Sequence, residues 1–420
     1  MTKSLLAGAL LLVLAVVPLS SMTPGYGASE DLSLFMSSKE NNNYLLNNLK
    51  LWFQLDVSSE FSLYVRGKHQ YARLLNAADG TSSADSRQSV LDLDLGYFSW
   101  RNEDVALFAG RSLMTLGSGL LFDGAADGLD LRLSAGPLDL RVFGAYTGFI
   151  VGDSNPYNFS RQDISDGARR RVAEVGGAVE FGAGWSLTAN GLIQRDQGDV
   201  EASRYDTAHL SLALEGALSP AVTLSLEGAL QGGEGPESTG TSMREISAWA
   251  LTFRMQFALL DQSETAFAID AAMATGSDNR YEHTPGGLDG EGRDTQFYSF
   301  GTYSTGFAFE PDLSNLIYAA LSFTTMPFSQ GSMFGRSSFT LKTSLYFKTD
   351  KAGPTSELAT TDTRNNPASA FLGFAADATW AWRVVSDVSL VFAAGVFKPG
   401  TAWTDRTLES LIQTTVVFAF

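Results

Sequence analysis

The sequence predicts an all-β protein, a single antiparallel transmembrane β-barrel of about 18 strands with short periplasmic turns and long external loops. Three observations predict this class. The chain begins with a short apolar segment of the kind that directs export, polar and apolar residues alternate in many short stretches, and the links between those stretches are alternately short and long.

Residues 1–27 are predicted to be a signal peptide that is removed on export. Lys3 precedes an apolar run from Leu5 to Val17, and small residues follow before the first polar stretch. Cleavage after Gly27 fits the small-x-small pattern of leader ends. The alternative is a permanent membrane helix, but the run is shorter than the roughly 20 residues that span a bilayer. Residues 28–420 are then the mature barrel, placed in the cell outer membrane.

The composition excludes several kinds of site and partner. The chain has no cysteine, so it has no disulfide framework, zinc-thiolate site or thiol nucleophile. Its formal net charge of −17 argues against nucleic-acid partners, which need a basic surface. We predict no cofactor and no metal site.

Alternation with a period of two predicts the strands. Leu51, Phe53 and Leu55 fall on one face of such a stretch, whereas Lys50 and Gln54 fall on the other. A soluble β-sandwich also alternates, so the links decide between the two classes. Short links at 58–59, 102–103 and 182–183 alternate with long polar ones, which are 74–87, 114–127, 147–169, 196–204 and 231–242.

If the N-terminus lies in the periplasm, counting the membrane crossings of the chain decides the assignment of two ambiguous segments. Residues 31–37 are needed as a first strand, and 277–313 must be one long external loop, because a further strand at 296–309 would make the total odd. The predicted strands are 31–37, 44–57, 60–73, 88–101, 104–113, 128–136, 137–147, 170–182, 184–195, 205–217, 220–232, 243–257, 264–276, 314–326, 336–349, 368–383, 386–397 and 408–420.

The last predicted strand ends on an aromatic residue. Alternation runs through Ile412, Val416 and Phe418, and the chain stops at Phe420. This ending resembles the signal by which the outer-membrane assembly machinery recognises its clients. The expected partners are therefore that machinery, through Phe420, and the lipids of the outer membrane.

Three local patterns carry a family resemblance. They are Gly110-Arg111-Ser112 with Gly117 and the later run Asp127–Arg132, then Asp312–Leu316, then Gly395–Gly400. In their order along the chain they resemble the alginate-export family of outer-membrane porins, although Ser112 stands where that family usually has glutamine. The resemblance implies a passive outer-membrane channel, not an enzyme, that passes hydrophilic solutes or a polysaccharide.

The polar face of each strand is expected to line the channel. Acids and bases are mixed along these faces, and Arg132 and Arg141 lie beside Asp130 and Asp139, either as structural pairs or as part of a local cationic constriction. A conduit for a polyanion needs unpaired cations, so the mixture favours a hydrophilic channel over a strongly anion-selective one. The predicted lining residues are Lys50, Arg66, Lys68, Asp92, Asp94, Asp130, Arg132, Asp139, Arg141, Arg254, Lys342 and Lys348.

The segment 277–313 is the predicted gate. It begins Gly-rich and continues with aromatic residues, of which Phe297, Tyr298, Phe300 and Tyr303 would narrow the pore or stack on sugar rings if the segment folds into the mouth. The alternative is a surface hairpin that packs its own aromatics.

Two rival functions are also compatible with the sequence. One is a surface adhesin or receptor barrel whose pore is plugged. The other, less favoured, is an outer-membrane lipid hydrolase, because His209 and Ser211 share a strand face at the spacing of a base and its nucleophile. That chemistry also needs a residue to orient the histidine and an oxyanion site, for which the sequence gives no signal.

Overall fold

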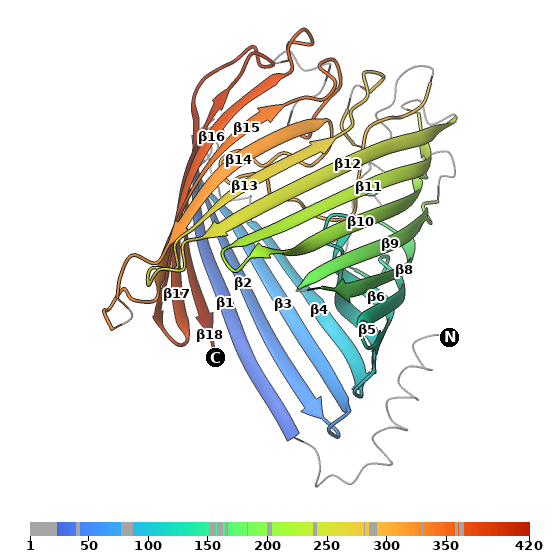
Figure 1. Cartoon of the computed structure of the whole chain (residues 1–420), viewed down its shortest axis with the longest axis vertical. Coiled ribbons are helices and arrows are strands. Elements are labelled where there is room, and N and C mark those ends of the chain that lie inside the picture. Colours follow the sequence, from blue (N-terminus) through green and yellow to red (C-terminus); the bar gives the residue numbers. More distant parts are fainter. Residues whose placement is uncertain are drawn as a thin grey trace.

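The chain forms one closed antiparallel sheet of 18 strands, as predicted (Figure 1). The computed structural model describes residues 23–38, 43–76, 87–150, 157, 163, 167–182, 184–199, 204–237, 242–280, 282–284, 292–329, 331–357, 360 and 365–420. The strands are β1 Thr23–Ser37, β2 Asn43–Asp56, β3 Phe61–Asn76, β4 Arg87–Arg101, β5 Val105–Leu116, β6 Phe122–Ala135, β7 Leu138–Tyr146, β8 Arg170–Phe181, β9 Trp185–Asp196, β10 Asp206–Ser219, β11 Val222–Pro236, β12 Met243–Ala258, β13 Ala266–Ala274, β14 Leu316–Thr325, β15 Ser337–Phe347, β16 Phe371–Val385, β17 Val388–Pro399 and β18 Glu409–Ala419.

The first and last strands close the barrel. β1 pairs with β2 on one side and with β18 on the other, so no sheet edge is left open. Ala28 and Phe420 exchange two backbone hydrogen bonds, with N···O distances of 3.1 and 2.8 Å. The Oγ of Ser33 and the Oγ1 of Thr415 lie 2.7 Å apart across the same seam.

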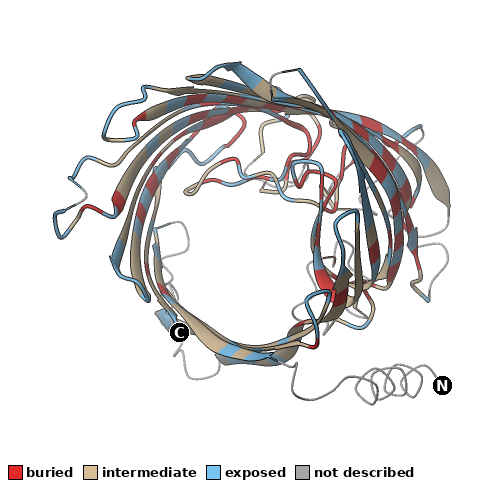
Figure 2. Ribbon diagram, turned by 60° about the horizontal axis from the view of Figure 1, so that its bottom comes forward, coloured by how far each residue is buried: buried red, intermediate tan, exposed pale blue. Residues whose placement is uncertain are grey.

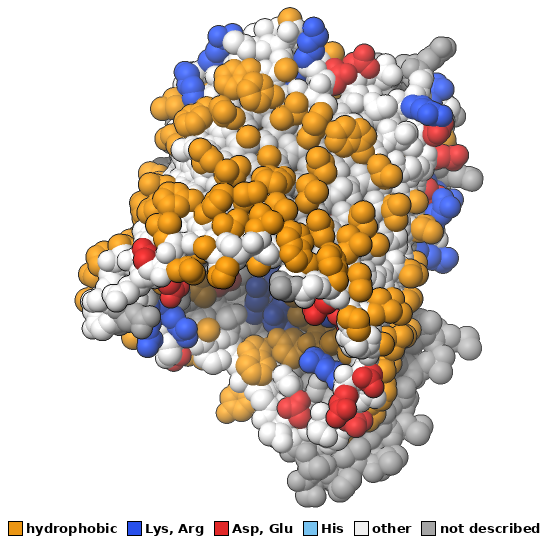
Figure 3. Space-filling model, viewed as in Figure 1, with side chains coloured by type: hydrophobic (Ala, Val, Ile, Leu, Met, Phe, Trp, Pro, Cys, Tyr) orange, Lys and Arg blue, Asp and Glu red, His pale blue; other side chains and the backbone are white. Residues whose placement is uncertain are grey.

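The two faces of each strand differ as the alternation predicts. On β10, Leu210 and Leu212 are 57% and 56% exposed on the outer face, whereas His209 and Ser211 are buried on the inner face. Figure 3 shows hydrophobic side chains spread over the outer face of the barrel. An apolar outer band is what contact with lipid requires.

The predicted strand boundaries were wrong most clearly at β1, β5 and β6. The predicted link 114–127 is mostly strand, since β5 continues to Leu116 and β6 begins at Phe122. Its residues do not alternate because Met114, Leu116 and Phe122 are buried inside the barrel and none of them faces lipid. β1 begins at Thr23 rather than residue 31, so it includes residues assigned to the end of the signal peptide; residues 1–22 of that predicted segment lie outside the described residues.

Long connections enter the barrel from one end. The described parts of the chain between β13 and β14 lie against the inner wall, and Figure 2 shows the ribbon of such loops gathered on one side of the barrel. The Gly-rich part of this connection at 285–291 lies outside the described residues. None of the described residues belongs to a helix that is long and apolar enough to cross a membrane.

The assignment of the outer face predicts which substitutions destabilise the barrel in a membrane. Leu212→Arg places a charge among lipid tails, and we expect it to lower the free energy of unfolding by roughly 2–4 kcal/mol. Urea unfolding in phospholipid vesicles measures this loss. Thr188→Arg, on the inner face of β9, is the matched control and is expected to cost much less. Equal losses in the two variants would show that the faces are assigned wrongly.

Candidate functional site

The predicted lining bases of β2 and β3 lie on the inner face beside acids of β4. Lys50 is paired in register with Lys68 on β3. The Nε of Arg66 donates to the carboxylate of Asp94 at 2.5 Å, and the Nζ of Lys68 lies 3.9 Å from the same carboxylate. Two of these three bases, Arg66 and Lys68, therefore share one acid.

A second group of predicted charges is self-contained. Asp130 is buried and accepts hydrogen bonds from Arg132 at 2.8 Å and from Arg141 at 2.8 and 2.9 Å. Asp139 does not join them, since it accepts from the Oγ of Ser134 at 2.6 Å. The two guanidinium groups are thus neutralised in part by one carboxylate that water does not reach.

The remaining predicted lining charges are dispersed around the barrel. Arg254 pairs with Asp270 at 3.2 Å, and the Nζ of Lys342 lies 5.4 Å from the centre of a tyrosine ring, that of Tyr318. Lys348 lies just beyond β15 in the connection to β16. It is buried there, and its Nζ donates to the carbonyl oxygen of Gly353 at 3.2 Å, so it does not line the channel wall.

The family-like arginine also has acidic partners. The guanidinium of Arg111 lies 3.0 Å from the carboxylate of Asp127 and 3.5 Å from that of Asp92. Asp92 is also one of the predicted lining residues. Its guanidinium also donates to the carbonyl oxygens of Leu93 and Phe149, at 2.6 and 2.8 Å. The arginine of the first motif is therefore the link between β4, β5, β6 and the connection that follows β7.

We call residues 275–280, 282–284 and 292–315 the inner segment, and its contacts with the inner wall run from β10 to β17. The part of the segment around Tyr298 is hydrogen-bonded to side chains of β10 and β11. The backbone N–H of Tyr298 donates to Oε1 of Gln231 at 2.8 Å, and the Nε2 of His209 lies 3.0 Å from the carbonyl oxygen of Tyr298. Both side chains are buried beneath the segment.

The inner segment next pairs with the β5–β6 tip, which we define as residues 117–121. The backbone N–H groups of Phe300 and Thr302 donate to the carbonyl oxygens of Leu121 and Gly119, each at 3.1 Å. Gly301 lies between them, and a Cβ there would overlap the carbonyl oxygen of Gly119. Only glycine permits this close approach.

The β5–β6 tip is fastened in turn to the inner wall. The hydroxyl and the backbone N–H of Ser118 both donate to Oε2 of Glu227 on β11, the latter at 3.3 Å. Gly117 has a φ of +59°, and a Cβ there would lie 2.5 Å from the Glu227 carboxylate. Two inward-folded pieces of chain therefore support each other inside the barrel.

The far end of the inner segment is held by β16 and β17. The carboxylate of Asp377 accepts the backbone N–H groups of Phe307 at 3.0 Å and Ala308 at 3.1 Å. The ring of Phe309 stacks on Phe397 with a centroid distance of 4.0 Å and an interplanar angle of 7°. A Cβ on Gly395 would lie 2.8 Å from the Cβ of Ala308, so the segment rests directly on the strand.

The four predicted gate residues anchor the inner segment. Phe297 and Phe300 are buried and meet the ring of His209 edge to face, with centroid distances of 6.3 and 5.9 Å. Tyr298 is buried as well, and Tyr303 packs against Tyr318 at 6.1 Å. Burial raises the pKa of Tyr303 to about 12, so its hydroxyl stays neutral at physiological pH.

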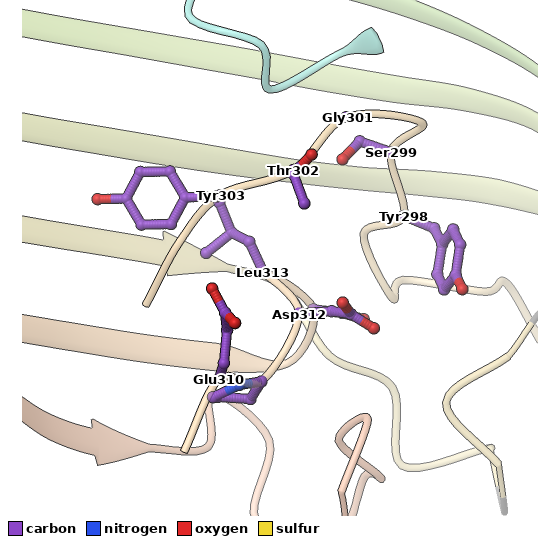
Figure 4. Close-up of a pocket in the computed structure, with 10 residues that line it drawn as sticks. Tyr298, Ser299, Gly301, Thr302, Tyr303, Glu310, Asp312 and Leu313 are labelled. Atoms are coloured by element: carbon purple, nitrogen blue, oxygen red, sulfur yellow. The ribbon is translucent and has the colours of Figure 1, made fainter. Parts of the chain in front are cut away.

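Two carboxylates on the inner segment were missed from the sequence. Glu310 and Asp312 line a pocket with Tyr298 and Tyr303, and both are exposed. Figure 4 shows Glu310 and Tyr303 on one side of this pocket and Asp312 and Tyr298 on the other. The sequence had shown this stretch as aromatic, and its acids carried no motif.

His209 and Ser211 do not form a catalytic pair in the described residues. The Nε2 of His209 is occupied by the carbonyl oxygen of Tyr298, and the Oγ of Ser211 accepts from the Nδ2 of Asn190 at 3.2 Å. Both side chains are buried on the inner wall.

The residues of all three family-like patterns take part in this arrangement. Gly117 permits the tip to approach Glu227, and Phe397 stacks on the inner segment. Asn315, with a φ of +51°, ends the segment, and its Nδ2 donates to the carbonyl oxygens of Asp350 and Pro354 at 3.0 and 2.9 Å. The patterns therefore mark the points where the inner segment meets the wall.

Comparisons with known proteins agree with the barrel. The model of the family described as "Alginate export" matches residues 187–416. No curated protein matches the sequence. Among solved structures, OccK5 (OpdH) of Pseudomonas aeruginosa superposes with a TM-score of 0.61 at 11% identity, covering 96% of this chain and 98% of that one.

Two further structures from the same organism show the same fold. The outer membrane protein OpdK superposes with a TM-score of 0.61 at 10% identity, covering 95% of this chain and 99% of that one. OccK11 (OpdR) superposes with a TM-score of 0.58 at 12% identity, covering 94% and 96%. At these identities the likeness concerns the fold of the barrel.

The contact at Gly301 is predicted to hold the constriction. Gly301→Ala forces the inner segment away from the β5–β6 tip, at an overpacking cost of about 1–3 kcal/mol. We expect a larger and noisier single-channel conductance in planar bilayers. Gly144→Ala is the matched control, because no atom lies within 4 Å of its new Cβ. A Gly301→Ala channel that conducts like the wild type would show that this contact does not set the pore.

Proposed function

The chain belongs to the alginate export family and is a passive channel of the outer membrane, and we propose that it passes small hydrophilic solutes without a strong preference for anions. The charges of the inner wall support this weak selectivity, and the position of the inner segment supports a route along the opposite wall.

The pairing of the inner-wall bases carries this proposal. Arg66, Arg132 and Arg254 each lie within 3.2 Å of a carboxylate. Lys50 and Lys342 have no carboxylate within ion-pair distance among the described residues. A conduit for a polyanion needs a ring of unopposed cations, and two separated lysines do not make one.

The route supports weak selectivity as well. The inner segment is bonded to β11 and β16 and the β5–β6 tip to β11, and Figure 2 shows the ribbon of the inward-folded loops gathered on one side of the barrel. Solutes would pass with the exposed acids Glu310 and Asp312 on the segment and the bases Lys50 and Lys68 on the β2–β3 wall. Opposite charges on two sides of a passage suit polar, uncharged solutes such as sugars.

The two rival functions have less support. The family and the fold are those of channels, so an adhesin or receptor with a plugged barrel is not favoured. We also propose that the barrel is not an enzyme, because His209 and Ser211 are buried and each is hydrogen-bonded to another residue rather than to the other.

Assembly and processing form a separate part of the proposal. Phe420 is 74% exposed beside the seam between β1 and β18, a position from which its ring can contact the assembly machinery. Cleavage after Gly27 would make Ala28 the first residue of the mature chain. Ala28 is the residue that bonds to Phe420, so both ends of the mature chain would meet at the seam.

Reversal potentials in planar bilayers test the proposed selectivity. Under a salt gradient the wild-type channel is expected to give a reversal potential near zero. Asp94→Asn removes the acid shared by Arg66 and Lys68 and is expected to shift the reversal potential toward anions. Asp104→Asn, in a short turn outside the channel, is the control. A wild-type channel that is already strongly anion-selective would contradict the proposal.

The role of Phe420 predicts a defect in assembly without a defect in stability. Phe420→Ser is expected to lower the amount of folded barrel in outer-membrane fractions, measured as the heat-modifiable band on gels. The purified barrel should keep its free energy of unfolding to within about 1 kcal/mol, because the ring is exposed. Phe149→Ser, which is 68% exposed in an external connection, is the control. Wild-type amounts of folded Phe420→Ser barrel would rule out this role.

A further inference from the structure

The inner face of β8 carries almost no side chain at two successive inward positions, which are Gly176 and Ala178. A Cβ on Gly176 would lie 2.2 Å from the Oε1 of Glu174 and 2.4 Å from the Oδ1 of Asn190, so a larger residue does not fit there. Because neighbouring strands lie about 4.8 Å apart, β7 and β9 flank this bare stretch with a separation of about 10 Å. The inner wall is therefore hollowed into a groove along β8.

Polar side chains form both walls of this groove. The residues that pair in register with the bare stretch are Arg141 and Asp139 on β7, and Asn190 and Thr188 on β9. The β5–β6 tip also lines the groove, as does Glu215 of β10. The groove has a volume of about 360 Å³, which is at the small end of the range for ligand pockets.

Several polar groups of the groove have hydrogen-bonding capacity left. Arg132 lines the groove and donates to Asp130 through Nε and Nη2, and its Nη1 has no partner among the described residues. Asp139 accepts from Ser134 through Oδ1 alone, so its Oδ2 is available. The hydroxyl of Thr188 likewise has no partner in the described part of the chain. A small ligand can therefore find a donor and several acceptors within one groove.

The charges of the lining favour a ligand without net charge. Two bases, Arg132 and Arg141, and two acids, Asp139 and Glu215, line the groove. The side chain of Arg132 is 48% exposed, and both acids are exposed. An anion would meet the two carboxylates, and a cation would meet the two guanidinium groups. A hydroxyl group both donates and accepts, so a polyhydroxyl compound can pair with groups of both kinds.

We propose that this groove binds one uncharged sugar ring, an inference that rests on the proposed passage of small hydrophilic solutes through the channel. The ring lies over Gly176 and Ala178. Its hydroxyl groups accept from the Nη1 of Arg132 and donate to Asp139 and to Thr188. Because the groove adjoins the β5–β6 tip, a bound sugar lies beside the constriction and obstructs part of the ion current.

Single-channel recordings of the whole barrel in planar bilayers, titrated with D-glucose, test the proposal. We expect glucose to add current noise to the wild-type channel, and the concentration dependence of this noise gives a dissociation constant. D-glucuronate and D-glucosamine keep the ring but carry a negative and a positive charge, and both are expected to bind more weakly than glucose.

Two substitutions in the groove are expected to weaken glucose binding. Ala178→Leu fills the space over β8 and should abolish the glucose-dependent noise. Thr188→Val keeps the shape of the side chain but removes its hydroxyl, and should raise the dissociation constant about fivefold, as expected for the loss of one neutral hydrogen bond. Ala381→Leu and Thr379→Val, on the inner face of β16, are the matched controls and should bind glucose as the wild type does.

Three results would overturn the proposal. Glucose noise that is equal in all five proteins would place the binding elsewhere, and an absence of noise in the wild type would show that no sugar is held. Stronger binding of glucosamine or glucuronate than of glucose would identify a charged solute as the occupant. Reversal potentials on the same channels separate this failure from that of the proposed selectivity, because a weakly selective channel without glucose noise loses only the binding site. Thr188→Val tests the groove even if Ala178→Leu fails to fold, which heat-modifiable gel mobility shows.

Discussion

The inward course of the inner segment is the constraint on which the interior of the barrel depends. An 18-stranded barrel by itself encloses a wide aqueous space. Here its inner face from β10 to β17 is covered by a single stretch of backbone, whose N–H and C=O groups need partners once they leave water. Gln231, His209 and Asp377 supply those partners, so the wall contributes polar side chains to the loop as well as to the channel.

The sequence was sufficient for the barrel but not for its interior. Alternation along a strand such as β2 reveals its outer face, because every residue that faces the membrane must be apolar. The inner face obeys no such rule, since a side chain there meets either water or the inner segment. Phe297 and Phe300 were predicted as gate residues from their aromatic pattern, whereas their burial against the wall, and the exposure of Glu310, depend on contacts between distant strands.

For the charged residues too, the sequence predicted which residues lie near one another but not which of them form pairs. Arg132 and Arg141 were noted as neighbours of two acids, and the structure brings both arginines to Asp130 alone, because its carboxylate points between β6 and β7 while Asp139 turns to Ser134. The alternation of β15 predicted that Lys348 faces the channel, but the strand ends one residue before it. Buried there, its amine has a pKa lowered to about 8, which suits a loop anchor better than a channel charge.

The cover that the inner segment gives to β10, β11 and β16 has a consequence for any effort to widen the pore. A shortened segment would not leave a smooth, inert cylinder for nanopore sensing. It would uncover His209, Gln231 and Asp377, which are now buried beneath the segment, and would present them to passing analytes as a new polar surface. An engineered wide pore from this scaffold would therefore need these positions replaced together with the loop.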